Sequence, residues 1–139
     1  MKLLALLPLL LLTGCLTDDR YARTVDDYAG AAQRVELGMT PSQVANILQP
    51  TQDRLAQHVR RSPEQYISNG QELRIEYYRS GWQADGRLTD DEYTPYLFKN
   101  GRLIAYGWQA LRACPDHPQA ANIHWVRIIA PEQRRLSLH

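Results

Sequence analysis

The sequence predicts an α+β fold, with two N-terminal helices packed on a three- to four-stranded antiparallel meander and a C-terminal extension. Three observations support this prediction. Apolar residues recur at helical spacing from Tyr21 to Val35, a complete helix-start signal surrounds Thr40, and an Asn-Gly turn at 100–101 separates two strand-like segments. Strands joined by such tight turns pair antiparallel, so a meander is expected.

Residues 1–14 are predicted to be an export signal. Lys2 supplies a positive start, a leucine-rich run extends to Leu12, and two small residues follow. The run is too short to span a membrane, because a span needs about 20 apolar residues. It ends in Leu12-Thr13-Gly14-Cys15, which resembles the bacterial lipobox. The resemblance implies cleavage before Cys15 and fatty acylation of that cysteine, which would anchor the mature protein to a membrane.

The residues after Cys15 predict where the protein is anchored and how it is organised. Gram-negative lipoproteins with aspartate directly after the cysteine stay at the inner membrane, and here that residue is Leu16. By that resemblance we expect the lipid anchor at the periplasmic face of the cell outer membrane. Residues 15–20 are expected to form a short lipidated tether and residues 21–139 a single domain.

The charge balance excludes nucleic acid as a partner. Loss of the signal removes one lysine, which leaves 15 basic residues (16 − 1) and 15 acidic residues, a formal net charge of zero. Nucleic-acid-binding proteins need a clustered basic surface, which this chain lacks. If Cys15 is acylated, Cys114 has no cysteine partner within the chain. We expect it to be buried as a small apolar residue rather than held in an intermolecular bond.

Two helices are predicted at the start of the domain. In the first, the apolar positions follow at steps of three and four: Tyr21, Val25, Tyr28, Ala32 and Val35. Gly38 ends this helix. The second begins at Thr40 as N-cap, with Pro41 at the first helical position and Gln43 completing a capping box. Pro50 is expected to end it.

The first two strand predictions rest on less uniform signals. Residues 51–66 allow either a helical turn or an irregular first strand, and we favour the strand. After a turn at 68–70, apolar and polar residues alternate from Leu73 to Tyr78. This alternation is typical of a half-buried strand.

The later strands are predicted with a clearer turn signal. Residues 96–99 and 103–108 are expected to form a hairpin around Asn100-Gly101, because Asn-Gly fits a type I′ turn. Alternation places on one face Leu103, Ala105 and Gly107, and on the other Ile104, Tyr106 and Trp108. Residues 123–129 could add an edge strand or pack across the sheet.

Two short motifs resemble the BamE/SmpA-OmlA family of small bacterial outer-membrane lipoproteins. They are Leu37-Gly38-Met39-Thr40 and Val44-Ala45-Asn46-Ile47-Leu48, which match a family segment of Gly-Met-Thr followed by a helix that packs on a sheet. The run Thr94–Ile104 more closely resembles a related family of uncharacterised lipoproteins. The resemblance covers roughly residues 35–110. It implies a BamE-like fold and a role in envelope assembly or maintenance.

Two groups of residues have the side chains of a metal site. Asp85, Thr89 and Glu92 match the second half of an EF-hand calcium loop, but the first half is absent and the flanks are predicted strands. Cys114, His117 and His124 could supply three ligands, with Asp116 nearby; Cys114 and His117 have an acceptable spacing for a first pair, but the spacing to His124 matches no metal motif. A polar loop and a proline-rich turn explain the two segments more simply, so we expect no metal and no cofactor.

Aromatic side chains are numerous for one small sheet, and two helices can cover only one of its faces. The second face is therefore a candidate protein-binding surface, unless the C-terminal segment covers it. Its candidate residues are Tyr78, Trp82, Tyr106 and Trp108.

No cluster of residues forms a convincing catalytic centre, so the sequence predicts a non-enzymatic protein. We expect a lipoprotein of the outer membrane that binds another envelope protein through its sheet or its 80–93 loop. The alternative is a calcium- or small-ligand-binding envelope sensor. A periplasmic enzyme that uses Cys114 with a histidine is a third possibility, for which no orienting group is identifiable.

Overall fold

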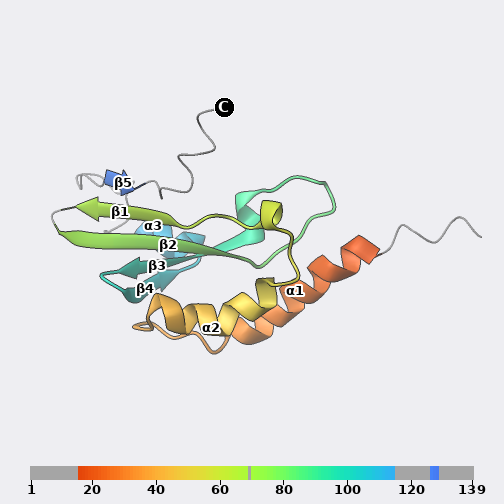
Figure 1. Cartoon of the computed structure of the whole chain (residues 1–139), viewed down its shortest axis with the longest axis horizontal. Helices are drawn as coiled ribbons and strands as arrows, with labels where there is room; N and C mark the ends of the chain where they lie inside the picture. Colours follow the sequence, from red (N-terminus) through yellow and green to blue (C-terminus); the bar gives the residue numbers. More distant parts are fainter. Residues whose placement is uncertain (1–15, 69, 115–125, 129–139) are drawn as a thin grey trace, which may run out of the picture.

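A computed structural model describes residues 16–68, 70–114 and 126–128 and has the predicted α+β arrangement (Figure 1). Two long helices come first, α1 (Leu16–Ala32) and α2 (Pro41–Gln52). The strands are β1 (Glu64–Ser68), β2 (Gln71–Arg79), β3 (Tyr93–Lys99), β4 (Arg102–Tyr106) and β5 (Val126–Ile128). The short helices are η1 (Gln57–Val59), η2 (Asp90–Glu92) and α3 (Trp108–Ala113).

The sheet has the order β4-β3-β2-β1-β5, and every neighbouring pair is antiparallel. Strands β1 to β4 form the predicted meander. The fifth strand comes from the C-terminal extension and lies beside β1, which is the edge-strand alternative for residues 123–129. None of the helices in the described ranges combines the length and the apolar character needed to cross a membrane.

Helix α1 begins earlier than predicted. The residues expected to be a tether form its first turns, since α1 starts at Leu16. Two contacts between positions four apart fit this start: Arg23 pairs with Asp19 at 2.5 Å, and the Thr24 hydroxyl donates to the Arg20 carbonyl at 2.9 Å. The Asp19–Arg23 pair adds a few tenths of a kcal/mol to a helix, which favours its extension toward the N-terminus.

Helix α2 begins as predicted and ends later. Thr40 Oγ1 accepts from the Gln43 amide at 3.2 Å, and Gln43 Oε1 accepts from the Thr40 amide at 2.9 Å, so the capping box is complete. Pro50 lies inside the helix, which corrects the prediction that it ends there. The tertiary structure holds the last turn, because the Gln52 side chain donates to the Arg79 carbonyl and accepts from the Arg79 amide.

The region after α2 is only partly a strand. Residues 57–59 form η1, and β1 starts at Glu64, so the predicted strand over 51–66 is wrong for most of its length. Leu55 and Val59 are nevertheless buried, at 4% and 5% exposure. Their burial explains why this segment contains apolar residues: they pack in the interior without belonging to a strand.

The hairpin turn is confirmed, but its second strand is shorter than predicted. Asn100 and Gly101 both have positive φ, 49° and 76°, as a type I′ turn requires. Strand β4 ends at Tyr106, and after Gly107, at φ 84°, Trp108 begins α3. The predicted extension of the strand to residue 108 is therefore wrong, because the positive φ of Gly107 redirects the chain into a helix.

An irregularity in β4 also overturns the predicted alternation. Leu97 pairs with Ala105 and Phe98 with Leu103, so Ile104 is an extra residue at a β-bulge. Leu103 consequently packs in the core under α1 and α2, whereas Ala105 packs in the core of the opposite face. A bulge shifts the side-chain alternation by one residue, which a reading of the sequence alone does not reveal.

Both faces of the sheet are covered. On one face, α1 and α2 lie side by side along the sheet (Figure 1), and their buried residues pack against Tyr78, Tyr96, Phe98 and Leu103. On the other face, Leu111 of α3 packs with Leu73, Ile75, Leu97 and Ala105. The alternative that the segment after the meander covers the second face is thus correct for this part of the sheet.

Candidate functional site

The loop between β2 and β3 folds around one buried carboxylate. Glu92 is 1% exposed, and its carboxylate accepts from Arg79 Nη2 at 2.7 Å, from the Gln83 amide at 3.0 Å and from the Thr89 amide at 3.2 Å. The Glu92 carbonyl accepts from the amides of Ser80 and Gly81, at 2.9 and 3.0 Å. One residue therefore holds several turns of the loop in place.

Arg79, at the end of β2, is the partner of this carboxylate and is 3% exposed. Besides Nη2, its Nε donates to the Gly81 carbonyl at 3.3 Å, and its guanidinium carbon lies 4.9 Å from the ring centre of Tyr21. Nη1 is buried without a hydrogen-bond partner among the described residues. A buried donor left unpaired costs about 1–3 kcal/mol, so the guanidinium is incompletely satisfied.

An open groove of about 390 Å³ lies beside the ion pair. Its walls come from three segments that are distant in the sequence: Tyr21 in α1, His58 in η1, and Trp82, Arg87 and Leu88 in the β2–β3 loop. In Figure 1 this loop lies at the same end of the molecule as the start of α1. The rings of Tyr21 and Trp82 are parallel within 1°, with centroids 5.9 Å apart, and join the helix to the loop.

The calcium candidates do not converge on a site. Both Glu92 oxygens already accept hydrogen bonds, and the Thr89 hydroxyl accepts from the Glu92 amide in a capping box. Asp85 is exposed, and its Oδ1 accepts from the Arg87 amide at 2.9 Å. Within the described ranges, no three His, Cys, Asp or Glu side chains are placed to hold a metal ion. These residues instead belong to a loop in which the Glu92 carboxylate pairs with Arg79 of the same chain.

The cysteine–histidine candidates are only partly described. Cys114 is a free, half-buried thiol that packs against the core of the second face. Its packing fits the expectation of a small apolar residue. His117, His124 and Asp116 lie outside the described residues, as does Cys15.

Two of the four predicted protein-binding aromatics have structural roles. Tyr78 is 4% exposed in the core under the helices, where its hydroxyl donates to Glu76 at 2.9 Å, so it cannot contact a partner. Burial, with the nearby Glu76 charge, raises the pKa of Tyr78 above its usual value. Trp108 Nε1 donates to the carbonyls of Asp90 and Tyr93, at 2.9 and 2.8 Å. That ring fixes α3 to the sheet.

The other two aromatics remain accessible, and they lie on different surfaces. Trp82 is half-buried in the groove wall. Tyr106 is 48% exposed at the end of β4, with its ring stacked on Tyr96 at 5.7 Å. Trp82 lines the groove and Tyr106 lies on the edge strand β4, so the four candidates do not form the expected single aromatic face.

Strand β4 forms an edge of the sheet. The Gly38 amide donates to the Leu103 carbonyl, and the Leu103 amide donates to the Met39 carbonyl, both at 2.8 Å. Past this contact, no strand in the described part of the chain pairs with the outer side of β4. Leu37, 63% exposed, comes just before residues 38–39, which pair with Leu103. Tyr106 is the last residue of β4 and lies beyond that contact. This edge offers backbone groups together with apolar side chains.

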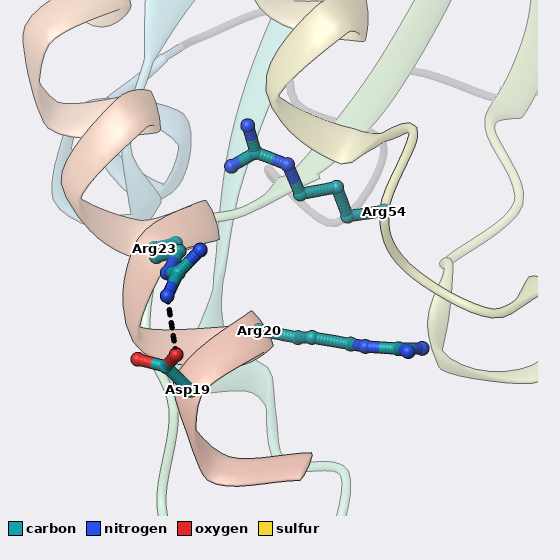
Figure 2. Close-up of a pocket in the computed structure, with 4 residues that line it drawn as sticks. All are labelled: Asp19, Arg20, Arg23 and Arg54. Atoms are coloured by element: carbon teal, nitrogen blue, oxygen red, sulfur yellow. Dashed lines mark hydrogen bonds and ion pairs between the residues drawn. The ribbon is translucent and has the colours of Figure 1, made fainter. Parts of the chain in front are cut away.

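A second cleft, of about 420 Å³, lies where α1 begins (Figure 2). It is lined by Asp19, Arg20, Arg23 and Arg54. Figure 2 shows Arg23 paired with Asp19 while the Arg20 side chain extends away from them. Arg54 pairs with Asp27 at 2.7 Å. The side chains of both pairs are about half exposed or more, so each pair contributes little to stability. Within each pair, the arginine and the aspartate largely cancel each other's charge.

Sequence reasoning missed the ion pair and the groove. Arg79 and Glu92 are 13 residues apart on either side of a loop, and no local pattern connects them. The only signal was an arginine at the end of a strand in which apolar and polar residues alternate, which is also common at exposed strand ends. Tyr21 and His58 come from other segments and join the site only in the folded chain.

A family model described as protein of unknown function (DUF3192) matches residues 18–113, which extend from the first turn of α1 to the end of α3. The match includes the groove and the β4 edge. Comparison with curated proteins and with solved structures finds no match.

Proposed function

The chain belongs to the DUF3192 family, and for this member we propose a non-enzymatic role as a lipid-anchored protein-binding module of the bacterial envelope. Cys15 carries the lipid at the periplasmic face of the outer membrane, and the β4 edge binds an extended segment of another envelope protein. The observation that carries the proposal is Tyr106, an aromatic side chain 48% exposed on an open sheet edge.

Edge strands with exposed apolar side chains are common docking sites, because they offer unpaired backbone groups to a partner strand. Here segment 38–39 pairs with Leu103, and no other strand among the described residues pairs with the outer side of β4. Tyrosine is among the residues enriched at binding hot spots, since its ring is large and its hydroxyl remains hydrogen-bonded. Stacking on Tyr96 holds the Tyr106 ring in one orientation before a partner arrives.

Two sequence features support the membrane anchor. The first is the lipobox-like Leu12-Thr13-Gly14-Cys15, and the second is the resemblance to BamE/SmpA-OmlA lipoproteins, which implies the same order of helices and strands.

Helix α1 starts one residue after Cys15. A helix rises about 1.5 Å per residue, so a lipid on Cys15 would hold Tyr21 only about 9 Å from the anchor.

The anchor is tested by exchanging each cysteine separately in cells. We expect the parent protein and Cys114→Ala to fractionate with membranes and to carry an added lipid in intact-mass analysis. Cys15→Ala should lose the lipid and the membrane association. Membrane association of the Cys15→Ala protein equal to that of the parent would contradict the anchor.

The docking edge is tested by photo-crosslinking in cells, with a photoreactive amino acid at position 106 or, as a control, at exposed position 34 in the turn after α1. We expect one envelope protein to be captured from position 106 and not from position 34. With the photoreactive residue at Leu37, Tyr106→Asp should abolish capture of the same protein. Equal capture from positions 34 and 106, or capture unaffected by Tyr106→Asp, would contradict the docking edge.

A further inference from the structure

The groove beside the Arg79–Glu92 pair has an unsatisfied hydrogen-bond donor. Arg79 Nη2 donates to the Glu92 carboxylate and Arg79 Nε donates to the Gly81 carbonyl, while Arg79 Nη1 has no partner in the described part of the chain. Arg79 also lines the groove. An acceptor brought by a ligand would pair a donor that the protein itself leaves unpaired.

The charges that line the groove favour an anion. Arg79, Arg87 and His58 line it, and none of the described residues in its lining is an aspartate or glutamate. Glu92 compensates Arg79, so Arg87 leaves the lining with a net positive charge. Of the other acidic residues of the loop, Asp90 pairs with Arg61, whereas Asp85 and Asp91 accept hydrogen bonds from neutral groups and are not part of the groove lining.

The walls of the groove favour a flat or apolar body attached to that anion. The stacked rings of Tyr21 and Trp82 line it, together with Leu88, which is 52% exposed. Ligand sites generally combine apolar and aromatic walls with a few fixed polar groups. The volume of about 390 Å³ is at the lower end of the range for small-molecule sites, about 300–1,000 Å³.

We propose that this groove binds a small organic anion, with its carboxylate held by Arg87 and Arg79 and its flat body against Trp82. The site is pre-organised, because the Glu92 hydrogen bonds fix the loop that carries Trp82 and Arg87. Pre-organisation lowers the entropic cost of binding. The site is separate from the β4 edge, so it adds a ligand to the proposed role as a docking module.

The test uses the full-length, detergent-solubilised lipoprotein and two probes of nearly equal shape. Benzoate carries the anion, and benzamide is its neutral counterpart. We expect calorimetry to detect benzoate binding and benzamide to bind at least about tenfold more weakly, as for the loss of one charge-assisted hydrogen bond. Equal binding of the two probes, or no benzoate binding up to about 10 mM, well above a weak Kd of about 1 mM, would overturn the proposal.

Two variants at the site and two controls away from it locate the binding without touching the buried ion pair. Arg87→Gln should weaken benzoate binding by about tenfold, whereas Arg34→Gln, at an exposed arginine in the turn after α1, should leave it unchanged. Trp82→Ala should weaken the binding of both probes. Tyr106→Asp should not alter benzoate binding, which separates this site from the docking edge. Equal effects of the Arg87 and Arg34 variants would overturn the assignment.

Discussion

The core beneath α1 and α2 and the β2–β3 loop are stabilised in different ways. Many buried residues from several elements share the stabilisation of the core, among them Val44, Leu48, Phe98 and Leu103, none more than 1% exposed. The loop instead depends on the carboxylate of Glu92, which binds one side chain and two amides. Distributed apolar packing tolerates small changes, whereas a polar network around one charge fails when that charge is removed.

The largest expected effect is that of Glu92→Gln, which keeps the side-chain shape and removes the charge. Breaking a buried ion pair by changing one partner costs about 3–5 kcal/mol, because Arg79 is left buried and uncompensated. We expect urea unfolding to show this loss. The amides of Gln83 and Thr89 should lose their protection from hydrogen exchange. The amides that pair β2 with β3 should keep the same relative order of protection.

Two controls follow from the same geometry. Asp91→Asn changes the charge of the neighbouring exposed residue and should alter the free energy of unfolding by less than about 0.5 kcal/mol. Combining Glu92→Gln with Arg79→Met removes both buried charges and should recover more than half of the loss. A Glu92→Gln protein as stable as Asp91→Asn would show that the loop does not depend on this carboxylate.

In the core, Leu48→Ala should lower the free energy of unfolding by about 2–5 kcal/mol, through lost apolar burial and a residual cavity. Leu48→Ala should differ from Glu92→Gln in which amides exchange their hydrogens faster. We expect faster exchange throughout the sheet, since those amides exchange by global unfolding, with little change at Gln83 and Thr89. Selective exposure of the loop amides in Leu48→Ala would mean that the two regions are not independent.

A smaller effect is expected from alkaline pH, acting through tyrosines of the same core. Burial, with the Tyr28 hydroxyl 2.8 Å away, raises the pKa of Tyr96, and burial raises that of Tyr78. The unfolded chain loses these protons near pH 10 while the folded chain keeps them. Stability should therefore be unaffected below about pH 10 and fall above it by up to about 1.4 kcal/mol per pH unit for each tyrosine.

Unfolding curves between pH 9 and 11 measure this slope, and Tyr96→Phe should reduce it by the contribution of one group. A slope that is the same in the parent and in Tyr96→Phe would contradict the assignment to this residue. Burial also raises the pKa values of Tyr77 and Tyr93, which contribute to the slope in both proteins, so the difference between the parent and Tyr96→Phe reports on Tyr96.

The features predicted correctly from the sequence are those whose contacts are local. The capping box at Thr40 and the type I′ turn at Asn100-Gly101 each involve residues no more than three apart. The β-bulge at Ile104, the helix that begins at Trp108 and the passage of α2 through Pro50 were missed. Each of these depends on a contact with another element, such as the Gln52 side chain bound to the Arg79 backbone.

By itself, the sequence determined the fold class, the start of α2, the turn of the hairpin and the prediction of a lipidated Cys15, because each depends on neighbouring residues. Only the tertiary structure decided which aromatics are accessible: it buried Tyr78, fixed Trp108 and left Trp82 and Tyr106 on separate surfaces. It also brought Arg79 to Glu92 and made the groove. Burial and charge pairing are properties of segments that meet in space, and no local pattern records which segments will meet.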